Sequence, residues 1–198
     1  MVRIAVVFLI SLAVGWALSL QGLPWPVQPG FIGVAILIAA AFAARAWWAK
    51  RAVTGDDPGP PERETWHALV GYSVIAGHMV GGLSQRTDLH VGAGNTLALD
   101  SWLLVAGAVA AYLIVRSRDR TRDERDHVIQ NRGNVAGYWS LCGSIVILSL
   151  YLAFIPPPGL DGFTHFFIAN LIIGLIVVSE VVKQLTRLIA YGRGHRQD

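Results

Sequence analysis

The stretch VAGYWSLCGSIVILSLYLAFI, residues 135–155, carries no charged side chain over its whole length. A helix of about 20 mostly apolar residues is long enough to cross a hydrocarbon core of roughly 30 Å. The stretch therefore predicts a transmembrane helix. The whole chain is 54% hydrophobic and only 15% charged, which leaves too few charges to cover the surface of an ordinary soluble domain.

Five more segments have a similar length and composition on either side of this stretch. They are residues 4–20, 31–48, 66–83, 97–115 and 163–185. We predict an all-α polytopic membrane protein, with six transmembrane helices in a single membrane domain over residues 1–198. The same reading predicts cytoplasmic loops at residues 49–65 and 116–134.

The placement of lysine and arginine predicts the orientation of these helices. If Met1 is cytoplasmic, every lysine and arginine except Arg86 falls on the cytoplasmic side. Cytoplasmic loops of inner-membrane proteins retain positive charge, whereas translocated loops lose it. We therefore predict a bacterial inner-membrane protein with both termini in the cytoplasm. The net charge of +3 then reflects topology and attraction to the lipid bilayer, and we expect no nucleic-acid partner.

The first segment has a second interpretation, as a secretory signal cleaved near Ala17-Leu18-Ser19. Cleavage would leave five helices and an N-terminus outside the cytoplasm. The apolar run is longer than the core of most signal peptides. This length favours a retained helix.

A dense charge run, RSRDRTRDERDHVIQNRGN (116–134), precedes the opening stretch. Alternating charges of this kind fit a solvated extension, in which each ion pair contributes about a few tenths of a kcal/mol. Apolar residues recur on one face from Val128 to Ala136, which predicts a helix lying along the inner membrane surface, with Gly133 as a hinge. The candidate partner-binding residues are Arg122, Asp123, Glu124, Arg125, Asp126 and Arg132.

The sequence RDERDHVIQNRGNVAGYW resembles the signature of small bacterial multi-pass membrane proteins of unknown function. In these proteins an Arg-Asp-Glu-Arg cluster leads into a helix with an aromatic pair near its start. The matching residues are Arg122, Asp123, Glu124, Arg125, Asp126, Ile129, Arg132, Gly137 and Tyr138. The resemblance implies a regulatory or accessory role and gives little support to an enzyme. We therefore expect an accessory protein that docks a membrane or cytoplasmic protein, or a second copy of itself, through the charged loop.

Histidines in the apolar segments suggest an alternative, because ionisable groups are costly within a bilayer. His78 and His165 are candidate ligands for haem or a metal between facing helices, as in a membrane redox protein. No HxxxH, CxxC or HExxH spacing supports a metal site, so the main hypothesis includes no cofactor. Gly77 and Gly81 flank His78 in a GxxxG pair, which predicts close packing of another helix.

Glu180 supplies a second alternative, a small proton-linked transporter in which this carboxylate is the ionisable switch. His67, Tyr72 and Tyr138 are expected at a similar depth, so the four residues predict a pocket between the third, fifth and sixth helices. The ordinary explanation of Glu180 is an ion pair with Lys183, three residues later, whose charged ends reach toward the membrane interface.

Two Gly-Tyr pairs, Gly71-Tyr72 and Gly137-Tyr138, follow similar charged clusters and enter the membrane in the same direction. They suggest repeated helix hairpins, with the third and fourth helices matching the fifth and sixth. A third copy would be the first and second helices. Chance recurrence of Gly and Tyr near membrane interfaces is the competing explanation.

Overall fold

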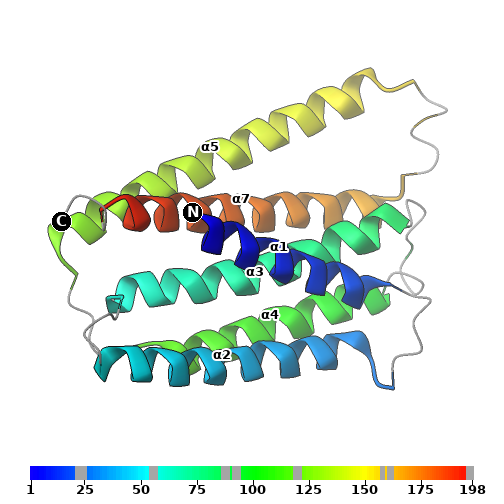
Figure 1. Ribbon diagram of the computed structural model, residues 1–198. Coiled ribbons are helices and arrows are strands. Elements are labelled where there is room, and N and C mark those ends of the chain that lie inside the picture. Colours follow the sequence, from blue (N-terminus) through cyan, green and yellow to red (C-terminus); the bar gives the residue numbers. More distant parts are fainter. Residues whose placement is uncertain are drawn as a thin grey trace.

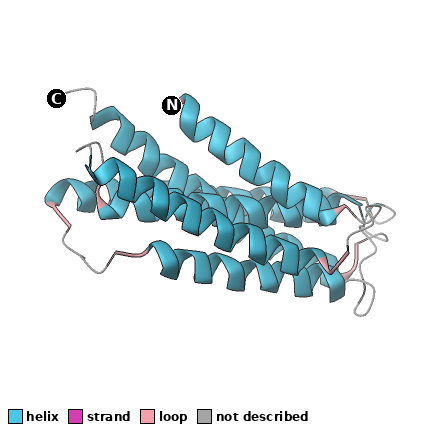
Figure 2. Ribbon diagram, turned by 60° about the horizontal axis from the view of Figure 1, so that its bottom comes forward, coloured by secondary structure: helices cyan, strands magenta, loops and turns pink. Residues whose placement is uncertain are grey.

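The structure, a computed structural model, describes residues 1–20, 26–53, 58–85, 90, 95–117, 122–156, 159 and 163–194. This part of the chain forms six helices, so the all-α prediction is confirmed. The helices are α1 (Val2–Ser19), α2 (Pro29–Val53), α3 (Pro60–Gln85), α4 (Asn95–Val115), α5 (Glu124–Phe154) and α7 (His165–Gly194). All run lengthwise along the bundle, with α1 and α5 inclined to the other helices (Figures 1 and 2).

The helices pack as three pairs, and α3 of the first pair lies at the centre and joins the other two. α1 packs on α3, α2 on α4 and α5 on α7, while α3 also packs on α4 and α7. The repeated hairpins would pair α3 with α4, α5 with α7 and, as a third copy, α1 with α2. The first two pairs pack together, whereas α1 and α2 meet only marginally, and the repeat itself stays a prediction. The buried core accordingly centres on α3, whose fully covered side chains include Leu69, Val74 and Met79.

Five helices are long and apolar enough to cross a membrane: α1, α2, α4, α5 and α7. The chain is therefore a membrane protein by the length and composition of its helices. The predicted sixth span at residues 66–83 is not confirmed, because α3 falls outside this set. The reason lies in its central position, since α3 can bury polar residues such as His67, Ser73 and His78 against neighbouring helices.

α5 begins earlier than the sequence predicts. Asp123 caps the helix, because its carboxylate accepts a hydrogen bond from the Asp126 N–H at 2.7 Å. The Asp126 carboxylate accepts one from the Asp123 N–H at 3.3 Å in return, which completes a capping box. From there α5 is continuous through Gly133. The predicted hinge at Gly133 and the separate surface helix are therefore wrong.

Gly133 and Gly137 serve packing between α5 and α7. A Cβ atom at Gly133 would lie 2.5 Å from the Arg187 side chain, and one at Gly137 would lie 3.1 Å from Lys183 Cβ. Both glycines are buried. Their missing side chains let the two helices approach at this end of the bundle.

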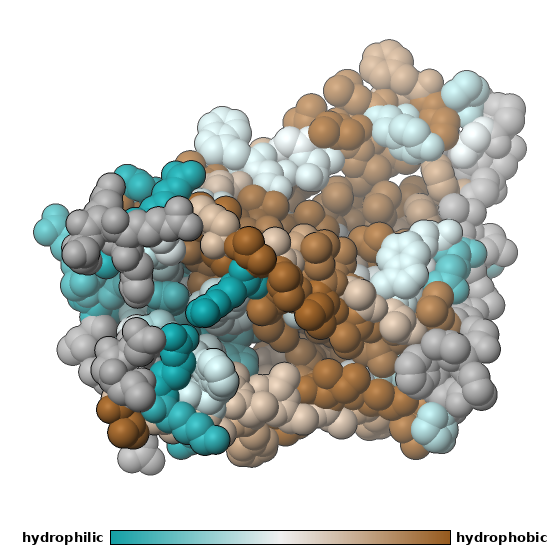
Figure 3. Space-filling model, in the orientation of Figure 1, coloured by the Kyte–Doolittle hydropathy of each residue, from teal (hydrophilic) through white to brown (hydrophobic). Residues whose placement is uncertain are grey.

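Hydrophilic residues gather at one end of the bundle, whereas the middle is mainly apolar (Figure 3). α1, α3 and α5 begin at this end, and α2, α4 and α7 finish there (Figure 1). We call it the charged end. Its basic residues include Arg3, Arg51, Arg63, Arg122 and Arg193.

Candidate functional site

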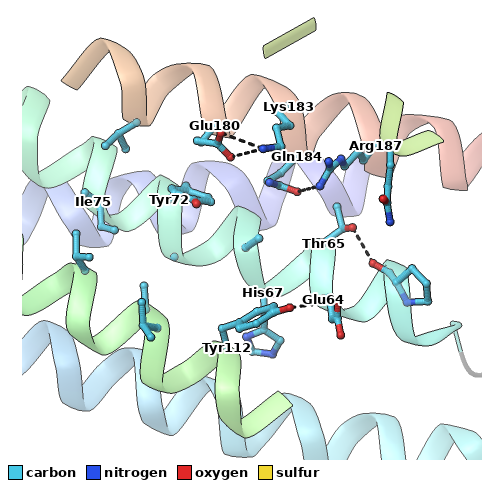
Figure 4. A pocket seen from close by; sticks show the side chains of 18 of the residues that line it. Glu64, Thr65, His67, Tyr72, Ile75, Tyr112, Glu180, Lys183, Gln184 and Arg187 are labelled. Atoms are coloured by element: carbon cyan, nitrogen blue, oxygen red, sulfur yellow. Dashed lines mark hydrogen bonds and ion pairs between the residues drawn. The ribbon is translucent and has the colours of Figure 1, made fainter. Parts of the chain in front are cut away.

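A cavity of about 400 Å³ lies on α3 between α4 and α7, at the charged end. We call it the central cavity (Figure 4). α4 and α7 both pack on α3 but scarcely touch each other within the described residues, which leaves this space open. Its polar lining residues are Glu64, Thr65, His67, Tyr72, Tyr112, Arg122, Gln130, Glu180, Lys183, Gln184 and Arg187. Ala68, Ile75, Val105, Ala108 and Val177 are among its apolar ones.

Glu64 holds one side of the cavity mouth together. Its carboxylate accepts a hydrogen bond from the Tyr112 hydroxyl at 3.3 Å. The same carboxylate oxygen lies 3.6 Å from Arg122 Nη2, which forms an ion pair. Arg122 also donates a hydrogen bond to Gln130 Oε1 at 2.9 Å. The charged segment, residues 122–134, is thus connected to α3 and α4 through one carboxylate.

Glu180 and Lys183 form an ion pair on the α7 wall, as the sequence predicted. Lys183 Nζ lies 3.0 Å from one Glu180 oxygen and 2.9 Å from the other. Both side chains are about a quarter exposed, at 27% and 24%. The negative charge of Glu180 is therefore neutralised by Lys183, a residue of the same helix.

Arg187 is the cavity cation whose hydrogen bonds go to neutral groups. Nη1 donates to Gln184 Oε1 at 3.4 Å and Nη2 donates to Asn134 Oδ1 at 2.9 Å. The stem of Arg187 packs on Gly133. Neutral amide oxygens orient the guanidinium but leave its positive charge without a counter-ion in these hydrogen bonds.

His67 is a buried imidazole with an open ring nitrogen. The side chain is only 8% exposed, and Nε2 has no hydrogen-bond partner among the described residues. The ring makes a T-shaped contact with Trp48 in α2, with centroids 5.4 Å apart. Figure 4 places it behind Tyr112, on the opposite side of the cavity from Glu180.

The structure brings together three of the four residues that predicted a pocket. His67, Tyr72 and Glu180 line the central cavity. Tyr138 is 63% exposed on α5, where its ring meets Trp139 at 5.7 Å. Tyr138 cannot face α7, because the neighbouring Gly137 occupies the contact face. Its assignment to the pocket is wrong, and α5 contributes Arg122 and Gln130 from its N-terminal region instead.

Glu64 and Tyr112 were missed by sequence reasoning. Glu64 begins a stripe at helical spacing that continues through Ala68, Gly71 and Ile75, all of which line the cavity. That periodicity was visible in the sequence and would have placed Glu64 on the same face. Tyr112 is a single polar group near the end of an otherwise apolar run, and only the fold shows that it faces Glu64.

Most of the candidate partner-binding charges make contacts within the chain. Asp123 caps α5, and Asp126 accepts a hydrogen bond from the Tyr191 hydroxyl at 2.8 Å. Arg125 Nη2 donates to the Tyr191 carbonyl oxygen at 3.4 Å. Glu124 and Arg132 are exposed. The segment is therefore partly a connection between helices, and Glu124 and Arg132 are its exposed charges without a hydrogen bond or ion pair among the described residues.

His78 and His165 occupy different environments. His78 is 2% exposed in α3, where its backbone lies close to Gly15 of α1. His165 is exposed at the start of α7. Among the described residues no group of three or more His, Cys, Asp or Glu side chains is arranged to hold a metal ion. The haem or metal hypothesis stays a prediction, and visible absorption lost in His78→Ala would support it.

Gly77 and Gly81 lie under α1. A Cβ atom on Gly77 would collide with the Leu12 carbonyl oxygen, and one on Gly81 would collide with Ser19 Oγ. Close approach of α1 explains the presence of both glycines. α1 is thus the helix that packs on this GxxxG pair.

No family model matches the chain, and no curated protein or solved structure matches it significantly.

Proposed function

We propose that this chain is an integral membrane accessory protein that binds a small amphipathic molecule with an anionic group in the central cavity. The observation that carries the proposal is the charge balance of the cavity. Both carboxylates, Glu64 and Glu180, already have cationic partners in Arg122 and Lys183. Arg187 hydrogen-bonds to neutral amides, so an anion would complete its pairing.

The remaining walls suit the apolar part of such a molecule. Ile75, Val105 and Val177 are apolar residues of the cavity lining. Val109 belongs to the same lining and is 54% exposed on α4, so the cavity reaches the lipid-facing surface. The volume of about 400 Å³ falls within the roughly 300–1,000 Å³ typical of small-molecule sites.

The proposal includes six membrane spans and a bacterial inner-membrane location. α3 runs beside the five apolar helices along the same axis, and its polar residues are buried against protein, so lipid does not oppose its crossing. The basic residues at the charged end favour a cytoplasmic location for that end and for both termini. The resemblance of the Arg122–Tyr138 stretch to bacterial multi-pass proteins supports the same assignment.

The accessory role follows from the position of the charged segment. Arg122 and Gln130 line the cavity, while Glu124 and Arg132 project outward from the same segment. A ligand that contacts Arg122 would change the position of those outward charges. A protein partner, or a second copy of the chain, that binds at Glu124 and Arg132 would then bind more tightly or more weakly.

The test compares three amphiphiles of equal tail length: decanoate, decanol and decylamine. Binding to the purified protein is measured by native mass spectrometry in a mild detergent. Decanoate should bind best, and Arg187→Gln should remove its advantage over decanol. The cavity-filling variant Ala68→Phe should weaken binding of all three.

Ala106→Phe is the matched control for Ala68→Phe, because Ala106 is exposed on α4. It should bind the three amphiphiles as the natural chain does. Equal binding of all three to the natural chain, unaffected by Ala68→Phe, would reject the proposal. The proton-linked transport hypothesis rests on Glu180 and stays a prediction. The ion pair with Lys183 does not favour it, because it neutralises the charge of this carboxylate.

A further inference from the structure

A second and larger hollow lies between α1, α2 and α3 at the charged end, with a volume of about 1120 Å³. We call it the α1–α2 groove. It exists because α1 packs on α3 and α2 packs on α4, so the first two helices barely meet. Figure 3 shows the surface hollowed between them. Because both helices are long and apolar enough to span a membrane, this hollow faces the lipid.

The floor of the groove is apolar. Val6 and Val7 of α1 and Val70 of α3 form one part of it. On α2 the lining residues Ala40, Ala43 and Ala44 recur at helical spacing, and their small side chains keep the groove deep. Such a floor suits an acyl chain, which needs no hydrogen bonds.

The rim of the groove is basic and aromatic. Arg3 and Arg51 line it together with the tryptophans Trp47, Trp48 and Trp66. The Arg51 guanidinium lies 6.0 Å from the centre of the Trp47 ring, within reach of a cation–π contact. Tryptophan and arginine at this depth are typical of the headgroup region of a membrane.

The carboxylate of Glu62 also lines the groove, but it already accepts a hydrogen bond. Glu62 Oε1 accepts a hydrogen bond from Trp66 Nε1 at 3.3 Å. Among the described residues of the lining, the charged groups are those of Arg3, Arg51 and Glu62. Two guanidinium groups at one rim can both donate hydrogen bonds to a phosphate.

His67 points to a bound molecule independently of this charge. It lies in the wall that the groove shares with the central cavity, and its ring contacts Trp48 of the groove lining. Its side chain is 8% exposed, and its Nε2 atom has no hydrogen-bond partner among the described residues. Buried polar atoms are nearly always paired. A polar group of a molecule seated in the groove would supply the partner.

We infer that the α1–α2 groove binds one anionic phospholipid from the surrounding leaflet. Its phosphate lies between Arg3 and Arg51 at the rim, and an acyl chain covers the alanine face of α2. An ester oxygen or headgroup hydroxyl of the lipid pairs with His67. Of the described lining residues the groove shares His67 alone with the central cavity, and the inference does not depend on the function proposed for that cavity.

The experiment measures lipid retention on the full chain by native mass spectrometry, with phosphatidylglycerol or phosphatidylcholine added in mild detergent. The natural chain should retain one phosphatidylglycerol in preference to phosphatidylcholine. Arg3→Gln and Arg51→Gln should each weaken phosphatidylglycerol binding about fivefold and leave phosphatidylcholine unchanged. Arg45→Gln and Arg116→Gln are charge-matched controls outside the groove and should change neither lipid.

A second variant tests the apolar floor without changing charge. Ala43→Phe fills the groove and should reduce binding of both lipids, while Ala106→Phe on the exposed side of α4 should not. Glycerol 3-phosphate serves as the competitor that carries the phosphate without the chains, and it should not displace the lipid. Equal retention of both lipids, equal losses in all four arginine variants, or displacement by glycerol 3-phosphate would each overturn the inference.

Discussion

The hydroxyl of Tyr191 donates a hydrogen bond to Asp126 Oδ1 at 2.8 Å, which ties the last turns of α7 to the first turn of α5. These residues are 65 positions apart in the sequence. Arg125 strengthens the connection by donating to the Tyr191 carbonyl oxygen at 3.4 Å. The first turn of α5 is therefore anchored on α7 through Tyr191.

Tyr191→Phe should loosen the first turn of α5. The substitution removes a hydrogen bond to a carboxylate, an interaction that contributes about 1.5–3 kcal/mol. Hydrogen–deuterium exchange at residues 124–131 should accelerate roughly tenfold or more, since about 1.4 kcal/mol corresponds to a factor of ten. Tyr151→Phe is the control, because Tyr151 is exposed in α5 far from this connection. Unchanged exchange in Tyr191→Phe would mean that the hydrogen bond does not hold the segment.

Charge reversal within the segment should separate structure from docking. Glu124→Lys and Arg132→Glu alter exposed side chains, so the protein should keep its thermal stability and lose a protein partner or self-association. Arg122→Glu breaks the pair with Glu64 and places two carboxylates together, so it should lower the melting temperature.

Affinity purification at native expression levels and a detergent melting curve measure these two properties for each variant. Docking through the exposed charges is rejected if Glu124→Lys and Arg132→Glu retain every stoichiometric partner of the natural chain. Loss of a partner in Arg122→Glu alone, with stability lowered, would assign the segment a structural role.

The close approach of α1 and α3 predicts different responses from two helical glycines. Gly77→Ala places a methyl group against the Leu12 backbone and should destabilise the fold by about 1–3 kcal/mol through overpacking. Gly143→Ala in α5 meets nothing within 4 Å and should be neutral or stabilising, by up to about 1 kcal/mol from helix propensity. Reversible unfolding in mixed micelles measures both. Equal free energies of unfolding for the two variants would contradict the tight α1–α3 contact.

The sequence was informative about individual helices and much less about their arrangement. Long apolar runs predicted the spans, and the GxxxG pair at Gly77 and Gly81 predicted a close helix neighbour. Hydropathy could not identify α1 as that neighbour, because lipid and a packed helix offer a similarly apolar environment. It also placed residues 66–83 among the spans, whereas α3 is not one of the five helices that are long and apolar enough to cross a membrane.

The candidate site was predictable only in part for the same reason. His67, Tyr72 and Glu180 were recognisable because polar groups stand out in apolar segments. Glu64 and Arg122, 58 positions apart in the sequence, meet only through packing of α3 beside the start of α5. Tyr138 matched Tyr72 in its local sequence, yet Tyr72 lines the central cavity and Tyr138 is exposed. The difference arises because α5 packs against a helix on one side only.

A last prediction concerns the far end of the bundle, where Asp100 of α4 caps α2. Asp100 Oδ1 accepts a hydrogen bond from the Gly30 N–H at 3.0 Å, and Asp100 is only 5% exposed. The first N–H groups of a helix have no partner within it, so this carboxylate satisfies one of them across two helices. Asp100→Ala should cost about 1–3 kcal/mol in the free energy of unfolding.

Asp100→Asn keeps an acceptor oxygen at the same position, so it should recover most of that loss. Ser101→Ala is the matched control, because the Ser101 hydroxyl is buried without a hydrogen-bond partner among the described residues. Its removal should leave stability unchanged or slightly raised. If Asp100→Asn is as unstable as Asp100→Ala, the negative charge matters more than the hydrogen bond, and Asp100 would act mainly on the positive end of the α2 dipole.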